Sequence, residues 1–231
     1  MQVRAVSESA VLVEFGREID EALIPVIVAA TDAIRKNLSS VLVDLIPSYT
    51  TLLCIYDCNQ VDSQWMVHAV SRLVETSGVE TGGDVRGRLV EIPVWYDPSV
   101  GYDLESLAKR SSLTVNEIIE LHTGRDYQVF AIGFNPGFAF LGRLDERIVT
   151  PRHSSPRRSV AKGSVGIADA QTAVYPMQSP GGWNIVGRTP TPMFDTALSD
   201  SEASLLTVGD RVRFVAIDRP EFLDLGGQLN D

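Results

Sequence analysis

The sequence predicts an α+β protein of two domains, a small N-terminal α/β sandwich-type domain followed by a β-barrel. Three observations support this. Strand and helix patterns alternate through the first 77 residues, a glycine-rich segment follows at residues 79–87, and short apolar runs separated by turn residues then recur about every ten residues. The first pattern is typical of helices covering one face of an antiparallel sheet, and the last is typical of a barrel. The expected domains are residues 1–85 and 86–231.

The N-terminal domain should begin with two short strands within residues 2–15, because apolar and polar side chains alternate there around a turn at Glu8 and Ser9. A helix capped by Asp20 is expected to run to about Leu38. Its side chains at helical spacing form an apolar stripe, which consists of Leu23, Ile24, Ile27, Ala30, Ile34 and Leu38.

Two more strands at residues 41–46 and 51–56 and a helix at residues 62–77 complete this domain in the prediction. Residues 79–87, with the sequence VETGGDVRG, are the expected domain boundary. The side chains expected to face the core from the second helix are Trp65, Ala69, Leu73 and Val70.

The barrel domain should open with a strand at residues 88–95, followed by two short helices. Asp103 is expected to cap the first helix, and Thr114 and Glu117 have the spacing of a capping box for the second. His122 lies at the end of that helix, where the helix dipole favours its charged form, and a histidine there is more often a structural cap than a catalytic acid.

Five later segments are expected as barrel strands, with their glycine- and proline-rich loops at the rims, and residues 218–231 are expected to form a poorly ordered tail. The five segments read YQVFAIGF, SVGIADA, TAVYPM, WNIVGRT and RVRFVAI.

Composition limits the possible functions. The net charge of −10 and the pI near 4.8 argue against a nucleic-acid partner, whose phosphates would need neutralising. The N-terminus does not resemble a signal peptide, and the apolar stretch at residues 22–30 is too short to span a membrane, so a cytoplasmic protein is expected. Cys54 and Cys58 would lie roughly 13 Å apart on an extended strand, too far for a disulfide. Both are expected to be buried thiols that bind no metal.

The common motifs for phosphate binding, serine hydrolysis and zinc binding are absent, so candidate chemistry rests on loops between residues 132 and 195. Pro136 and Gly137 form a turn that aims Asn135. Gly181 and Gly182 expose backbone N–H groups that suit an anion, next to Trp183, which could stack on a flat ligand. Each feature alone is also explained as an ordinary turn or hairpin.

A basic group in this acidic chain has two equal interpretations, a solvated loop or an anion site. It consists of Arg152, His153, Arg157, Arg158 and Lys162. Arg188 and Thr189, at a strand end, suit carboxylate recognition, with a surface ion pair as the alternative. Taken together, the loops predict one shared cavity for a small polar carboxylate.

The segments GFNPGFAFLGRLDERIVTPR and KGSVGIADAQTAVYPMQSPGGWNIVGRTP resemble the signature of a known family. This family includes the B subunits of 5-oxoprolinases, the KipI-type kinase inhibitors and the small subunits of allophanate hydrolase. The same unit occurs in the carboxyltransferase part of urea carboxylases. The resemblance covers most of the chain and implies a cyclophilin-like β-barrel as the second domain.

The resemblance also implies a function. The chain would be a subunit of an ATP-dependent 5-oxoprolinase that opens 5-oxo-L-proline to L-glutamate, with ATP as co-substrate and no metal or prosthetic group. It would act with a paralogous barrel subunit and a third subunit. Two alternatives remain, a KipI-type inhibitor of a sensor histidine kinase and a carboxyltransferase subunit related to allophanate hydrolase or urea carboxylase.

Site residues follow from the motif match and the loop chemistry together. The residues expected to take part in catalysis are Asn135, Gln171 and Arg188. The residues expected to bind the ligand are Gly137, Arg152, Lys162, Ser164, Thr172, Gly181, Gly182, Trp183 and Thr189.

Overall fold

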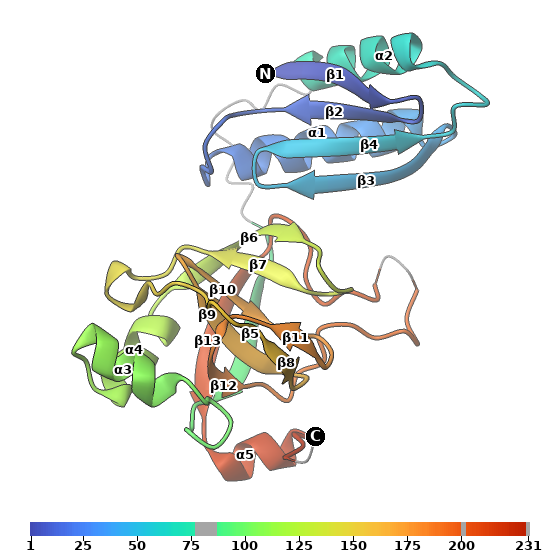
Figure 1. The fold of residues 1–231 in the computed structure, drawn as a ribbon. Coiled ribbons are helices and arrows are strands. Elements are labelled where there is room, and N and C mark those ends of the chain that lie inside the picture. The colour runs from blue at the N-terminus through green and yellow to red at the C-terminus, as the bar shows by residue number, and fades with distance from the viewer. Residues whose placement is uncertain (77–86, 200–201, 230–231) are drawn as a thin grey trace. The chain divides into compact units, whose positions relative to one another are not determined.

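A computed structural model describes residues 1–76, 87–199 and 202–229 of the chain. The chain divides into two compact units, Met1–Arg86 and Gly87–Asp231. Apart from Gly87, the expected boundary segment lies outside the described residues. The predicted fold class, a layered α/β domain followed by a barrel, is confirmed (Figure 1).

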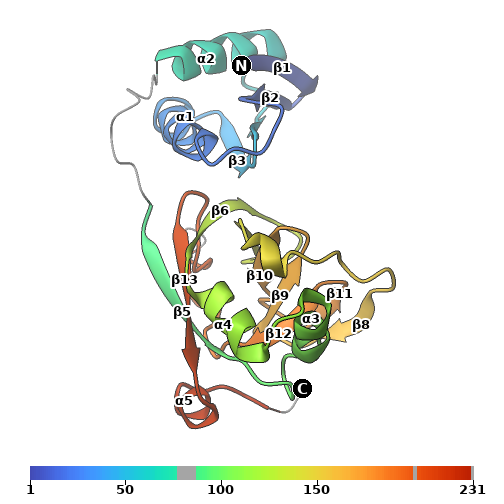
Figure 2. The same cartoon turned by 90° about the vertical axis from the view of Figure 1, so that its left-hand side faces the viewer.

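The first unit is an antiparallel sheet with two helices packed on one of its faces (Figure 2). Alternate residues of the two central strands are buried, which places Val11, Val13, Leu52 and Cys54 beneath the helices. The strands run in the order β1 (Gln2–Ser7), β2 (Ala10–Glu14), β4 (Thr51–Tyr56) and β3 (Leu42–Ser48), and the helices are α1 (Leu23–Leu38) and α2 (Ser63–Thr76).

Two details of this unit correct the expected helices. Asp20 does not cap α1, because its carboxylate accepts the N–H of Ala22 in a turn before the helix begins. In α2 the buried face is shifted by one residue. Asp62 accepts the N–H of Trp65 at 2.7 Å, and Trp65 is 47% exposed. The buried positions of α2 are Met66, Val70 and Val74, while Ala69 and Leu73 are partly buried beside them.

The two cysteines differ in their surroundings, so the predicted burial is confirmed for Cys54 and is wrong for Cys58. Cys54 is fully buried, and burial raises the pKa of its thiol to about 12. Cys58 is exposed, because it lies just beyond the end of β4. Neither forms a disulfide.

The second unit is built on a seven-stranded closed barrel. Neighbouring strands are antiparallel except for β5 and β13, which pair in parallel along their whole length. All five predicted runs form strands of this barrel. Around the barrel the strands are β6 (Asp126–Ile132), β13 (Arg211–Ile217), β5 (Leu89–Trp95), β12 (Asn184–Arg188), β9 (Ser164–Ala168), β10 (Gln171–Val174) and β7 (Ala139–Gly142), which returns to β6.

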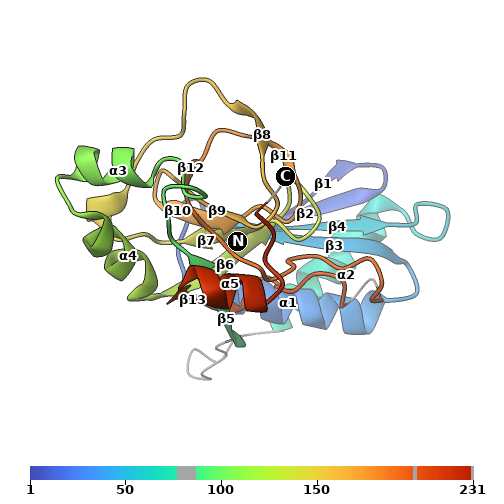
Figure 3. The same ribbon diagram turned by 90° about the horizontal axis from the view of Figure 1, so that it is seen from below.

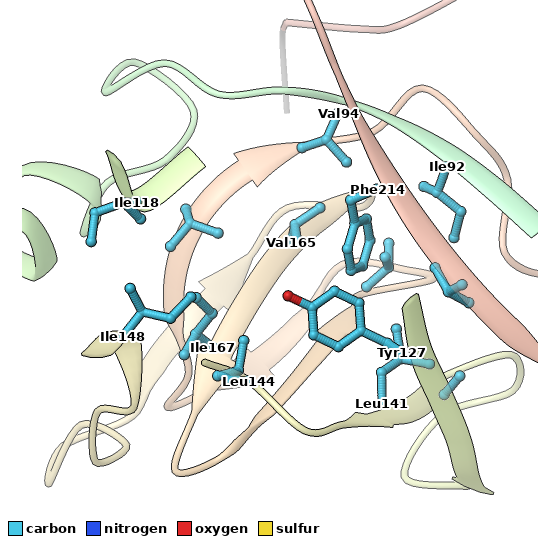
Figure 4. Packing of buried hydrophobic residues seen from close by; sticks show 14 of the residues in the cluster. Ile92, Val94, Ile118, Tyr127, Leu141, Leu144, Ile148, Val165, Ile167 and Phe214 are labelled. Carbon is cyan, nitrogen blue, oxygen red and sulfur yellow. The ribbon is translucent and has the colours of Figure 1, made fainter. Parts of the chain in front are cut away.

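The barrel interior is filled with aliphatic and aromatic side chains (Figure 4). The rings of Tyr127 and Phe214 lie 5.5 Å apart among side chains that include Leu141, Val165 and Ile167. The helices α3 (Leu104–Ser111) and α4 (Val115–Thr123) also contribute to this core. The capping box of α4 forms as predicted.

A second apolar cluster lies on the other face of the barrel wall. Leu141, Val174 and Val186 belong to the interior core, whereas Phe140, Ala173 and Ile185, each a neighbour of one of these, belong to the second cluster. Successive side chains of a strand point to opposite faces, so the second cluster is external to the barrel. A short two-stranded sheet, β8 (Arg157–Val160) with β11 (Ser179–Gly181), contributes Val160 to it.

The expectation of a poorly ordered tail at residues 218–231 is wrong for its first half, because α5 (Arg219–Asp224) forms there (Figure 3). Asp218 caps this helix by accepting the N–H of Glu221, and Pro220 occupies its first turn. Phe222 is fully buried and packs 5.4 Å from the ring of Trp95. Within the described residues, no helix is both long and apolar enough to cross a membrane.

Candidate functional site

Those expected site residues that line a pocket are divided between two separate pockets of the described barrel unit. The larger one, which we call the aromatic pocket, has a volume of about 320 Å³. It is lined by Phe134, Phe138, Phe140, Arg152, Pro156, Tyr175, Pro180, Gly181, Gly182 and Trp183.

The aromatic pocket is built on the external cluster of the barrel wall. Phe138 lies at its centre, with ring centroids 4.9 Å from Phe140, 5.4 Å from Tyr175 and 5.7 Å from Trp183, all in edge-to-face geometry. Edge-to-face rings hold one another in fixed orientations. The aromatic walls are therefore rigid and suit a small flat ligand.

Two polar side chains, Arg152 and Tyr175, line this apolar pocket. The guanidinium of Arg152 makes no hydrogen bond or ion pair with any described residue. A β-carbon on Gly182 would lie 3.6 Å from its Nε, so the glycine keeps the space beside that cation open. The Tyr175 hydroxyl is protonated at neutral pH and can donate, since the ordinary pKa of a tyrosine is about 10 and burial raises it further. The backbone of Gly181 lies against the Tyr175 ring so closely that no side chain fits there.

The rest of the basic group has other roles, so neither of its two interpretations applies to the group as a whole. Arg157 donates to Asp103 at 2.7 Å, and His153 lies 3.2 Å from the same carboxylate oxygen. Asp103 does not cap α3 as expected. Arg158 is exposed and lines neither pocket.

The smaller pocket, which we call the cationic pocket, has a volume of about 150 Å³. Its Arg188 is buried, with only 4% of its surface exposed, and donates to the carbonyl of Gln228 at 3.3 Å and to the hydroxyl of Tyr102 at 3.1 Å. The segment after α5 therefore covers part of this pocket. The lining residues are Lys162, Gly163, Arg188, Thr189, Pro190, Thr191, Phe222, Gly226, Gly227 and Gln228.

Five expected site residues line neither pocket. Asn135 and Gly137 form the turn before β7, where the backbone of Asn135 bonds to Gly133 and Phe138 and its buried Nδ2 has no partner among the described residues. Gln171 lies opposite Gly142 in the barrel wall. Ser164 and Thr172 are fully buried in their strands. Strand alternation sends side chains of one motif to opposite faces, so the motif cannot converge on one cavity.

His122 is a structural residue and not the charged helix end that its position predicts. Its ring is fully buried and stacks 4.6 Å from Phe214. The hydroxyl of Thr172 donates to the carbonyl of Gly166, so Nε2 of His122 must donate to Thr172, and Nδ1 accepts from Tyr96 at 2.7 Å. Burial lowers the pKa of His122 to about 3, which keeps it neutral.

Sequence reasoning missed most of the aromatic walls. None of Phe138, Phe140 and Tyr175 is among the site residues expected from the sequence. The available signal was the position of Phe138 and Phe140, two residues apart, which places both on one face of the same wall. Among the described residues, no group of three or more His, Cys, Asp or Glu side chains could hold a metal ion.

Fold and sequence together define the class of protein. Residues 1–206 match the family described as carboxyltransferase domain, subdomain C and D, and the chain belongs to this family. This confirms the predicted resemblance. Kluyveromyces lactis urea carboxylase shares the fold with a TM-score of 0.74 and 18% identity, over 96% of this chain and 22% of that protein.

Two further proteins are more similar to this chain in sequence. The chain is 39% identical to the B subunit of 5-oxoprolinase from Bacillus subtilis over 229 residues, which cover 96% of this chain and 95% of the relative. The solved structure of TTHA0988 has a TM-score of 0.79 and 33% identity, over 95% of this chain. The chain corresponds to only 41% of TTHA0988.

Proposed function

We propose that the chain is the B subunit of an ATP-dependent 5-oxoprolinase and that its aromatic pocket binds 5-oxo-L-proline. The observation that carries this proposal is 39% identity to a protein named as the B subunit of a 5-oxoprolinase, along nearly the whole length of both chains. The complex opens the lactam to L-glutamate with ATP as co-substrate. The urea carboxylase likeness concerns the fold alone.

The chemistry of the aromatic pocket fits this substrate. 5-Oxoproline is a small planar lactam with one carboxylate. Arg152 supplies a cation for the carboxylate, and such charge-assisted bonds are among the strong ones. The aromatic lining, which includes Phe138, Phe140 and Trp183, offers an apolar surface against which the ring can lie. The protonated hydroxyl of Tyr175 supplies a donor for the lactam oxygen.

In this function the chain binds 5-oxoproline, and the complex as a whole breaks the lactam bond. A lactam is resonance-stabilised, and phosphorylation by ATP activates it for opening by water. Among the described residues that line the aromatic pocket, none carries a carboxylate, imidazole or thiol that could act as base or nucleophile. Partner subunits would then supply these groups, which agrees with the naming of the relative as one subunit of several. The larger size of TTHA0988 shows that this unit also occurs joined to further chain.

Reconstitution tests the proposal. The chain is mixed with its partner subunits, ATP and 5-oxoproline, and glutamate is measured. We expect Arg152→Gln to raise KM for 5-oxoproline about tenfold or more, because a neutral amide replaces the charged partner of the carboxylate. Arg158→Gln is the matched control, since Arg158 is an exposed arginine of the nearby strand β8 and lines neither pocket.

Two results would contradict the proposal. A folded, complete complex that forms no glutamate would exclude the 5-oxoprolinase activity. Equal KM values for the two variants would exclude Arg152 as the carboxylate partner. Suppression of sensor kinase autophosphorylation by the chain, without any glutamate from the complex, would favour the inhibitor function instead.

A further inference from the structure

Asp103 is a buried acid with no role in the site as described so far. It lies at the start of α3 and is 5% exposed, yet its side chain makes no bond to its own helix. One carboxylate oxygen accepts the backbone N–H of Ile185 at 2.7 Å. The other accepts from Arg157 at 2.7 Å and lies 3.2 Å from Nε2 of His153. A buried carboxylate is costly unless it is paired and hydrogen-bonded, and this one is both.

The groups bound by Asp103 come from the two segments that wall the aromatic pocket. Arg157 and His153 flank Pro156 and follow Arg152 on one wall, and Ile185 follows Trp183 on the other. Asp103 therefore joins these segments through a single side chain.

One backbone bond and two bonds donated by side chains join the same two segments directly. The N–H of His153 donates to the carbonyl of Gly182 at 2.7 Å, and Arg157 reaches the carbonyl of Trp183 at 3.4 Å. Asn184 donates to the carbonyl of Pro151 at 3.0 Å. These bonds hold only while the loop before β8 stays against the segment that follows β11, and Asp103 is the one acid in this set of contacts.

The negative charge of Asp103 also decides which basic side chains near the pocket are paired. Three basic side chains, Arg152, His153 and Arg157, lie within six residues of one another. Asp103 binds two of them, and the third makes no ion pair among the described residues. Arg152 is thereby left available for an anionic ligand, and its loop is held in place.

We propose that Asp103 is a positioning residue that fixes Arg152 and the Gly182–Trp183 backbone around the substrate. This rests on the proposed function of the aromatic pocket. Asp103→Asn keeps the shape but turns one acceptor oxygen into a donor, so either Ile185 or the Arg157 pair loses its bond. Substrate binding should then weaken, while the bond-breaking groups elsewhere in the complex are unaffected.

The test compares Asp103→Asn with Asp126→Asn in the reconstituted complex. Asp126 is a matched control, because it accepts from Arg211 at 3.0 Å and Arg213 at 2.7 Å but lines neither pocket. For Asp103→Asn we expect KM for 5-oxoproline to rise about tenfold with kcat changed less than about threefold. Amide hydrogen exchange should quicken in peptides that contain His153 and Ile185, and Asp126→Asn should show neither change.

An unchanged KM in a folded Asp103→Asn complex, or a fall in kcat alone, would overturn the proposal. If that variant does not fold, Arg157→Gln breaks the same contact from its half-exposed side and should raise KM about threefold or more, and an unchanged KM there overturns it too. If the wild-type complex forms no glutamate, the proposed function fails by itself. Hydrogen exchange in the two peptides then decides, and unchanged exchange in Asp103→Asn overturns the positioning role.

Discussion

Lowering the pH from 7.5 to 5.0 should destabilise the barrel through one side chain, His122. Burial lowers its pKa from 6.5 to about 3, so the folded chain keeps the imidazole neutral across this range. The unfolded chain binds a proton there once the pH falls below 6.5. Because the unfolded state then holds more protons, stability is present above pH 6.5 and is lost as the pH falls towards 3. At about 1.4 kcal/mol per pH unit, the loss at pH 5.0 is about 2 kcal/mol.

The assay is denaturant unfolding followed by tryptophan fluorescence. A Trp65→Phe background removes the tryptophan of the first unit, so that Trp95 and Trp183 report on the barrel. We compare wild type with His122→Gln, which cannot titrate, and with His68→Gln, which removes an exposed histidine of the first unit. The pH-dependent loss should be smaller by about 2 kcal/mol in His122→Gln and unchanged in His68→Gln. Equal losses in wild type and His122→Gln would refute the reasoning.

Three further predictions concern single sites. Gly181→Ala should lower the free energy of unfolding by about 1–3 kcal/mol, because the added methyl group would overlap the Tyr175 ring. Gly133→Ala is the control and should cost far less, since no described atom lies within 4 Å of the added β-carbon. Similar denaturation midpoints for the two variants would contradict this. An aromatic disulfide reagent should titrate one thiol, Cys58, in the native chain and two in denaturant, and two in the native chain would show that Cys54 is accessible. Phe134 has a φ of 71°, a region in which Asn is more common than Phe, and its side chain is 64% exposed. Phe134→Asn should therefore leave the stability equal or higher while raising KM for 5-oxoproline. A loss of stability without a change in KM would remove Phe134 from the site.

The strands and helices of this chain were largely predictable because their patterns are local. The alternation in β2 and β4 and the capping box of α4 can be seen in a few neighbouring residues. Shorter elements escaped, since β7, β8 and β11 have only three or four residues and contain or adjoin glycine and proline. The capping pattern of Asp218, Pro220 and Glu221 was a readable signal for α5 that the prediction did not use.

The site was only partly predictable, because it depends on which face of the wall each side chain takes. Arg152, Gly181, Gly182 and Trp183 do come together in the aromatic pocket. Lys162, Arg188 and Thr189 belong to the cationic pocket. The role of Asp103 was beyond sequence reasoning, since its partner Arg157 lies 54 positions away in the chain. At position 103 a helix cap was the simpler explanation.

The wall formed by β7, β10 and β12 has two faces, one that packs into the barrel core and one that underlies the aromatic pocket. A substitution at Leu141, Val174 or Val186 changes the packing of the barrel core. A substitution at Phe140, the neighbour of Leu141 in the chain, changes the aromatic pocket instead. Substitutions at every second position of this wall can therefore alter the aromatic pocket while the barrel core is left intact.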